Sequence, residues 1–292
     1  MLGHGLGGPC NHVSGPEARS RFVSAIGGAV ASACTQAGLS AQHREFTAAC
    51  LGFSGGAEDK RALIAEMYVI ERLMVTTDAL IALTGATAGS PGMITIAGTG
   101  SIAMGRNAAG RLARAGGWGY VFGDEGGGFD IARQALRAAL RMEEGWGATT
   151  TLRAKLLDAT GARDANELLH RFYTPEFPRP KVAGYARLVE EAAGEGDGIA
   201  RELIAASAQQ LAAITAAVRQ QLFEEGEPAL VCYIGGVYRN EMLLERFRML
   251  VELQDGNRVQ APAMGPAAGA LIEAYRIAGV AVELHDVPET EK

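Results

Sequence analysis

The sequence of 292 residues has few cysteines and no long apolar run. The four cysteines, Cys10, Cys34, Cys50 and Cys232, show no CxxC spacing, which argues against a common zinc site and a dense disulfide framework. The apolar stretches are far shorter than the roughly 20 residues of a membrane-spanning helix. The start lacks the positive segment and apolar core of a secretion signal. We therefore expect reduced thiols, a cytoplasmic location and no membrane partner.

Positive charge is also scarce. The chain has 27 Lys and Arg against 33 Asp and Glu, a formal net charge of −6, and no long basic run. Because nucleic-acid binding needs a surface rich in Lys and Arg, this balance argues against nucleic acid as the main partner. A nucleotide such as ATP needs only a local positive or amide-rich site, so an acidic chain can still bind it.

The chain does contain ordinary core material and many glycines. Hydrophobic residues make up 48% and charged residues 21%, close to the average of globular proteins. At roughly 100–200 residues per domain, the length favours two domains. The 39 glycines cluster at a few places. Such clusters are typical of turns and ligand loops, and a flexible linker would spread its glycines more evenly.

Strand–turn–helix units follow one another along the chain and predict an α/β class. The turn signal at residues 89–92 predicts a domain boundary. A helix is expected to begin after Asn240, a good N-cap residue. The other expected helices cover residues 16–37, 58–68, 79–83, 129–142, 199–223 and 270–278. The whole segment 149–224, which contains the helix 199–223, is expected to be mostly helical. The expected strands cover residues 46–53, 72–77, 93–97, 102–106, 111–115 and 230–234.

The first candidate site is the turn Gly98-Thr99-Gly100-Ser101, directly after a buried strand. Two glycines allow the backbone to turn tightly and to bring amide groups against an anion. The hydroxyls of Thr99 and Ser101 add donors. The pattern is typical of a phosphate loop. The alternative is a hairpin turn without a ligand.

The second candidate is the glycine-rich loop of residues 116–128. Trp118 offers a flat apolar face of the kind on which sugars pack, and Asp124 and Glu125 offer acceptors for sugar hydroxyls. Glycines beside two acids and two aromatic residues favour a ligand site. The alternative is a mobile surface loop with a buried tryptophan.

Two further motifs lie at strand ends. Asp78 follows Thr76 and Thr77 at the end of a predicted strand, where ligands of α/β proteins bind, and its carboxylate could deprotonate a hydroxyl. Helix capping is the alternative role and the more common one. Gly235 and Gly236 end another strand and could let the backbone lie flat beside a nucleoside.

The order of these motifs resembles the N-acetylglucosamine kinase and BadF-type ATPase family of the actin-like superfamily. The resemblance runs from about Gly7 to about Ala278, and Gly-Trp-Gly followed by Gly-Asp-Glu is its specific part. It implies two ribonuclease-H-like domains that close on ATP, Mg²⁺ and a sugar in the cleft between them. Residues 1–90, with a C-terminal helix 270–284, would form the sugar-binding domain. Residues 91–269 would form the nucleotide-binding domain.

The resemblance also implies roles for single residues. Asp78 would be the general base on the sugar 6-hydroxyl. The resemblance assigns no side chain of this sequence to the metal. The residues implied to hold the nucleotide are Gly98, Thr99, Gly100, Ser101, Gly184, Gly235 and Gly236. The residues implied to bind the sugar, besides Asp78, are Asn11, Gly117, Trp118, Gly119, Asp124 and Gly128.

The function so implied is transfer of the ATP γ-phosphoryl group to the 6-hydroxyl of an amino sugar, with N-acetylglucosamine first and glucosamine second. Members of this family often form dimers, so a homodimer is an expected assembly. The family opens with a strand and an Asp-Gly-Gly-Gly-Thr phosphate loop, and Met1 lies after that point, so the first domain is expected to be truncated.

The missing loop motivates a second hypothesis, a sugar-binding or regulatory protein without kinase activity, because positioned phosphate donors supply much of the catalysis. A third hypothesis is an ATPase that activates a redox partner. No suitable cysteine follows the phosphate turn, which disfavours it.

Overall fold

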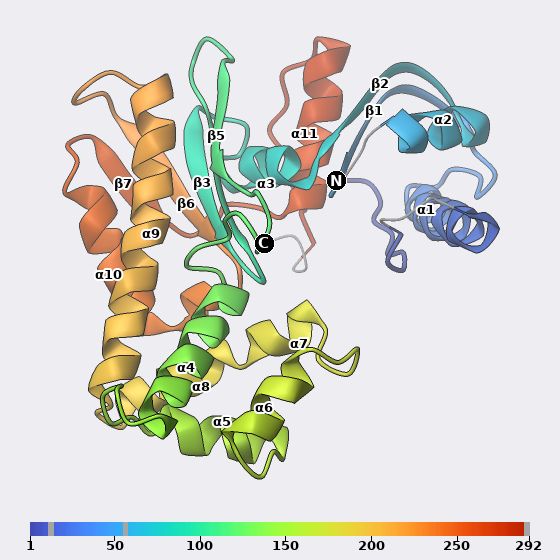
Figure 1. Cartoon of the computed structure of the whole chain (residues 1–292). Coiled ribbons are helices and arrows are strands. Elements are labelled where there is room, and N and C mark those ends of the chain that lie inside the picture. Colours follow the sequence, from blue (N-terminus) through green and yellow to red (C-terminus); the bar gives the residue numbers. More distant parts are fainter. Residues whose placement is uncertain (11–14, 55–57, 289–292) are drawn as a thin grey trace. The chain divides into compact units, whose positions relative to one another are not determined.

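The computed structural model describes residues 1–10, 15–54 and 58–288 (Figure 1). It divides into two compact units. Unit 1 consists of Met1–Ser90 and Pro262–Lys292, and unit 2 is the continuous segment Pro91–Ala261. Unit 1 is therefore assembled from both ends of the chain. None of the helices in the described part is long and apolar enough to cross a bilayer.

Unit 1 contains a pair of parallel strands with helices around it. Phe22 and Ile64 are fully buried in its core, and the Phe22 ring lies 5.6 Å from that of Phe53. The order is α1 (Pro16–Gln36), β1 (Glu45–Phe53), α2 (Glu58–Met67), β2 (Val69–Thr77), α3 (Asp78–Ala86) and, after unit 2, α11 (Pro266–Ala278).

Helix α11 begins before the predicted start at residue 270. Its end agrees with the predicted helix 270–278 and falls short of the domain helix 270–284. It begins at Pro266, because proline suits the first helical turn, where its missing N–H costs nothing. It ends at Ala278, because Gly279 adopts a left-handed conformation with φ of 79° and stops the helix. Residues 279–284 are therefore outside the helix.

Helices α3 and α11 touch through their backbones. A Cβ at Gly269 would overlap the carbonyl oxygen of Ile81, and a Cβ at Gly85 would overlap that of Gly265. Only glycine permits such an approach. The contact fixes the position of α3, whose first residue is Asp78.

We expect Gly269→Ala to lower the free energy of unfolding by about 2–3 kcal/mol, because the added methyl group must push the two helices apart. Urea unfolding measures the change. Gly28→Ala in α1 is the matched control, since a Cβ there meets nothing within 4 Å. That control is expected to stabilise the protein by about 0.5–1 kcal/mol. Equal stability of the two variants would contradict the close contact.

Unit 2 contains a five-stranded sheet in the order β5-β4-β3-β6-β7. The pairs β3–β4 and β4–β5 are antiparallel, whereas β3–β6 and β6–β7 are parallel. This strand order is that of a ribonuclease-H-like domain, and the α/β class is confirmed. The strands are β3 (Gly92–Ala97), β4 (Ser101–Arg106), β5 (Leu112–Gly116), β6 (Ala229–Ile234) and β7 (Asn257–Gln260).

Helix α9 packs on this sheet, and the Thr215 hydroxyl lies 2.6 Å from that of Thr95 on β3. Figure 1 shows α9 running along the strands, with a group of shorter helices beyond its lower part. The helices of unit 2 are α4 (Gly128–Glu143), α5 (Leu152–Thr160), α6 (Ala165–Phe172), α7 (Arg179–Gly184), α8 (Ala186–Gly194), α9 (Gly198–Leu222), the 3₁₀ helix η1 (Gly236–Arg239) and α10 (Glu241–Glu252). Asn240 caps α10 as predicted, its side-chain oxygen accepting from the Leu243 N–H at 3.0 Å.

Candidate functional site

The turn Gly98–Ser101 joins β3 to β4 and is bound to the loop that precedes α4. The amide of Gly128 donates to the carbonyl oxygen of Gly98 at 2.8 Å, and that of Phe129 donates to Thr99 at 3.0 Å. The Ser101 hydroxyl donates to the carbonyl oxygen of Glu125 at 2.6 Å. The predicted phosphate turn and the end of the predicted sugar loop thus form one backbone assembly.

Glycine is required where the two segments meet. A Cβ at Gly100 would overlap the Asp124 carboxylate, whose Cγ would be 2.5 Å away. A Cβ at Gly127 would lie 2.7 Å from the carbonyl carbon of Gly100. Ser101 is buried, and its hydroxyl is engaged by Glu125. In this structure Ser101 therefore supports the loop, and Gly98 and Thr99 are the turn residues that face open space.

That open space is a cavity of about 440 Å³ within unit 2. It brings together several predicted nucleotide residues and also Gly128, which the resemblance assigned to the sugar. Gly235 does not line it; with φ of 115° it packs against Ala97 at the start of the turn. The lining residues are Gly98, Thr99, Gly128, Ile131, Pro180, Ala183, Gly184, Ala186, Arg187, Glu190, Ile204, Gly236, Val237, Arg239, Asn240 and Leu243.

The cavity combines an apolar wall with polar and charged groups. Ile131, Ile204 and Leu243 supply an apolar wall for a flat base, while Thr99 supplies a hydroxyl. Arg187, Glu190 and Arg239 add charged groups that the sequence analysis did not single out. Charged residues on helices are usually solvated, so the sequence pattern did not distinguish these three from ordinary surface charges.

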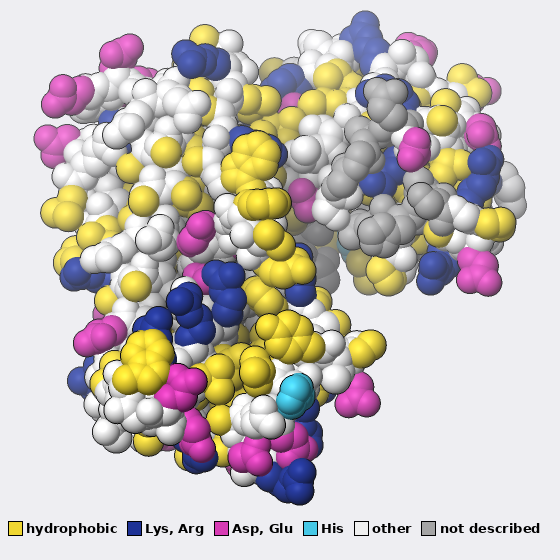
Figure 2. Space-filling model, viewed as in Figure 1, with side chains coloured by type: hydrophobic (Ala, Val, Ile, Leu, Met, Phe, Trp, Pro, Cys, Tyr) yellow, Lys and Arg dark blue, Asp and Glu magenta, His cyan; other side chains and the backbone are white. Residues whose placement is uncertain are grey.

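The predicted sugar loop presents its aromatic residues to solvent. Trp118 is 66% exposed, and the Arg114 guanidinium lies 4.8 Å from the centre of its ring. Phe122 is 83% exposed. The alternative of a buried tryptophan is therefore wrong. Figure 2 shows hydrophobic side chains gathered on this face of unit 2, next to a group of Lys and Arg side chains.

Asp124 of the same loop is held in place and is only 6% exposed. Its backbone adopts a left-handed conformation, with φ of 65°. Its carboxylate accepts from the Arg179 guanidinium at 3.0 Å and from the Ser101 amide at 3.4 Å. Gly117 and Gly119 also have positive φ, of 71° and 80°. The loop therefore has a defined shape.

Asp78 is the first residue of α3 and is exposed. Thr77 is the N-cap, its hydroxyl accepting from the Leu80 amide at 3.2 Å. The capping role considered for Asp78 is thus carried by its neighbour. The Asp78 carboxylate accepts only from the adjacent Ala79 amide, at 2.8 Å, among the contacts of the described residues. It keeps oxygen lone pairs for a ligand.

Asn11 lies outside the described residues, so its predicted contact with sugar stays a prediction. The four cysteines form no disulfide. Burial, together with the nearby Glu273, raises the pKa of Cys50 to about 12, and burial raises the pKa of Cys232 to about 11. Both thiols are therefore protonated at neutral pH and poor nucleophiles.

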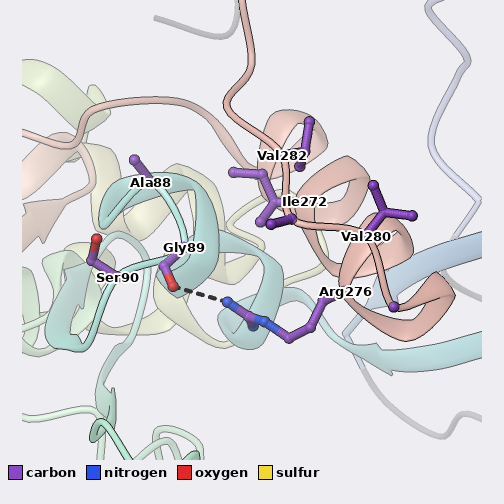
Figure 3. A pocket seen from close by; sticks show the side chains of 9 residues that line it. Ala88, Gly89, Ser90, Ile272, Arg276, Val280 and Val282 are labelled. Atoms are coloured by element: carbon purple, nitrogen blue, oxygen red, sulfur yellow. Dashed lines mark hydrogen bonds between the residues drawn. The ribbon is translucent and has the colours of Figure 1, made fainter.

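A second cavity, of about 460 Å³, lies in unit 1 between the end of α3 and the end of α11 (Figure 3). Its charged side chain, Arg276, points toward the turn after α3 and donates to the carbonyl oxygen of Gly89 at 2.9 Å. The same guanidinium pairs with the buried carboxylate of Glu273. Since the charge of Arg276 is already neutralised, this cavity offers less for an anionic ligand than the one in unit 2.

The sequence matches a model of the BadF/BadG/BcrA/BcrD ATPase family over residues 10–274. An N-acetylmuramic acid/N-acetylglucosamine kinase of Clostridium acetobutylicum is 34% identical over 215 residues, which are 72% of this chain and 70% of the relative. An N-acetyl-D-glucosamine kinase of Dictyostelium discoideum is 32% identical over 196 residues, which are 64% of this chain and 61% of the relative.

Among solved structures, the chain is similar to a Chromobacterium violaceum protein provisionally described as an N-acetylglucosamine kinase. The TM-score is 0.71 at 26% sequence identity, and the alignment covers 93% of this chain and 90% of the other. The likeness extends over both units.

Proposed function

The chain belongs to the BadF/BadG/BcrA/BcrD ATPase family, and from this membership we propose that it is an ATP-dependent kinase of amino sugars. The observation that carries the proposal is the backbone assembly of the turn Gly98–Ser101 with the loop that bears Trp118 and Asp124. A phosphate-binding element and a sugar-binding element built as one piece suit phosphoryl transfer to a sugar.

We assign the cavity of unit 2 to the nucleotide. The phosphates would lie against Gly98 and Thr99, and the base against the apolar wall, with Gly184 and Gly236 beside the nucleoside. Arg187 and Arg239 add positive charge that favours a polyphosphate.

Mg²⁺ would enter with the nucleotide as part of the substrate. Within the described residues, no three His, Cys, Asp or Glu side chains gather as a protein metal site requires. Mg²⁺ is commonly held by substrate phosphates with few protein carboxylates, so the phosphates of ATP would be its main ligands.

Asp78 would act as the general base. Its exposed carboxylate would accept the proton of the sugar hydroxyl as that oxygen bonds to the γ-phosphorus. The bond from the γ-phosphorus to the bridging oxygen breaks at the same time, and ADP leaves. The Trp118 ring would pack on the sugar, and Asp124 and Asn11 would bind its hydroxyls.

A coupled assay of ADP release with a panel of sugars tests the proposal. We expect turnover with N-acetylglucosamine, weaker turnover with glucosamine, and 6-phosphate products identifiable by NMR. N-acetylmuramic acid belongs in the panel because the Clostridium relative is named for it. No phosphorylation of any amino sugar or hexose, by this chain or by a chain extended with an Asp-Gly-Gly-Gly-Thr loop, would overturn the proposal.

Calorimetry separates the remaining hypotheses. Sugar binding without nucleotide binding would favour the sugar-binding or regulatory protein. An ATPase that activates a redox partner would hydrolyse ATP without a sugar, and the protonated thiols of the half-buried Cys50 and the buried Cys232 give it no support. The homodimer and the cytoplasmic location stay predictions.

A further inference from the structure

Arg179, the first residue of α7, contacts the predicted sugar loop at Asp124 and Tyr120, and it also contacts Phe129 at the start of α4. Its guanidinium donates to the Asp124 carboxylate at 3.0 Å. The same group lies 4.5 Å from the centre of the Tyr120 ring and 5.6 Å from that of Phe129. Those two rings pack edge to face at 5.2 Å. A single side chain thus holds both the polar and the aromatic part of the loop.

The helix that begins at Arg179 forms part of the nucleotide cavity. Pro180, Ala183 and Gly184 line the cavity, whereas Arg179 is not among its lining residues in the described part of unit 2. Helix α7 also packs tightly on the start of α4: a Cβ at Gly128 would lie 3.1 Å from the carbonyl oxygen of Ala183. Movement of α7 would therefore change the cavity wall.

The ion pair between Arg179 and Asp124 is unevenly buried, with side-chain exposures of 41% and 8%. A carboxylate as buried as that of Asp124 needs a charged partner, because loss of the partner leaves a desolvated charge uncompensated. Without Arg179, we expect Asp124 to turn toward water. That movement would withdraw the carboxylate from its place against Gly100 and disturb the phosphate turn.

We propose that Arg179 is a positioning residue that couples the sugar loop to the nucleotide cavity, so that bound sugar and bound nucleotide strengthen each other's binding. The proposal rests on the proposed function, because it needs both ligands. Sugar contacts at Asp124 fix the carboxylate, Arg179 transmits this to α7, and α7 closes the cavity wall. By thermodynamic linkage, the nucleotide must tighten sugar binding by the same factor.

Titration calorimetry of the full chain tests this coupling. The dissociation constant of a non-hydrolysable ATP analogue is measured with and without N-acetylglucosamine, and that of the sugar with and without the analogue. In the wild type we expect each ligand to tighten the other about 5-fold or more. In Arg179→Met the factor should fall to near one, with both separate affinities reduced.

Arg133→Met is the matched control. Arg133 contacts the same loop, donating to the Tyr120 carbonyl at 3.4 Å and to Asp130 at 2.7 Å, but among the described residues it bonds neither to Asp124 nor to α7. It should keep the wild-type factor. If Arg179→Met does not fold, Arg179→Gln, which is uncharged and shorter but keeps an amide donor, is judged by the same criterion.

Three results overturn the coupling and leave the kinase proposal intact. In the first, the wild type binds both ligands but neither changes the dissociation constant of the other. In the second, an Arg179 variant keeps the wild-type coupling factor. In the third, Arg133→Met loses as much of the coupling factor as the Arg179 variant. A wild type that binds neither ligand overturns the proposed function instead.

Discussion

Asp78→Asn is expected to lower kcat about 10²–10⁴-fold, the usual contribution of a general base. The amide keeps the size of the carboxylate and can still bond a hydroxyl, so the KM for the sugar should change little. Thr77 supplies the N-cap of α3, so the helix should remain intact. Steady-state kinetics with N-acetylglucosamine, together with a thermal unfolding curve, measure both effects.

The matched control for this prediction is Asp164→Asn. Asp164 also stands at a helix start, where its carboxylate accepts from the Glu167 amide at 2.8 Å, but it caps α6 in unit 2. Asparagine is an equally good cap, so kcat should stay within about twofold. An Asp78→Asn variant as active as this control would exclude the base role.

The second large effect is expected from Gly100→Ala. The added methyl group would meet the Asp124 carboxylate, with its Cγ 2.5 Å away, so the phosphate turn and the loop must separate. We expect affinity for the ATP analogue to fall at least about 100-fold, because the turn amides lose their alignment toward the phosphates. The free energy of unfolding should fall by about 1–3 kcal/mol.

Gly198→Ala provides the comparison in the same unit. Gly198 is the first residue of α9, and a Cβ there meets nothing within 4 Å. This variant should bind the analogue normally and gain about 0.4–1 kcal/mol of stability. Normal nucleotide affinity in Gly100→Ala would mean that the turn does not hold phosphate.

The sequence was most informative where local chemistry decides the structure. Buried strands, the Asn240 cap and the long alanine-rich helix follow from residue patterns and were predicted to within a few residues. Strand β7 was not predicted, because it has only four residues, of which only Val259 is buried. So short a pattern cannot be told from a loop, and its pairing with β6 is what makes it a strand.

The candidate site was predictable in its parts and not in its connections. The motifs at Thr99 and Trp118 are visible because glycines surround them. The bond between Asp124 and Arg179 joins residues 55 positions apart and depends on how α7 packs, which no local pattern records. The same holds for the Ser101 hydroxyl, which donates to the carbonyl oxygen of Glu125 in the loop.

The two-part construction of unit 1 has a consequence for synthesis on the ribosome. Unit 2 is continuous and can collapse as soon as residues 91–261 have emerged, whereas α3 must wait for α11, which is made after unit 2. Until then the side of α3 that carries Gly85 lacks its partner helix. The nascent chain therefore carries an unfinished unit 1 while all of unit 2 is being made, and the apolar surface that this leaves exposed is prone to aggregation.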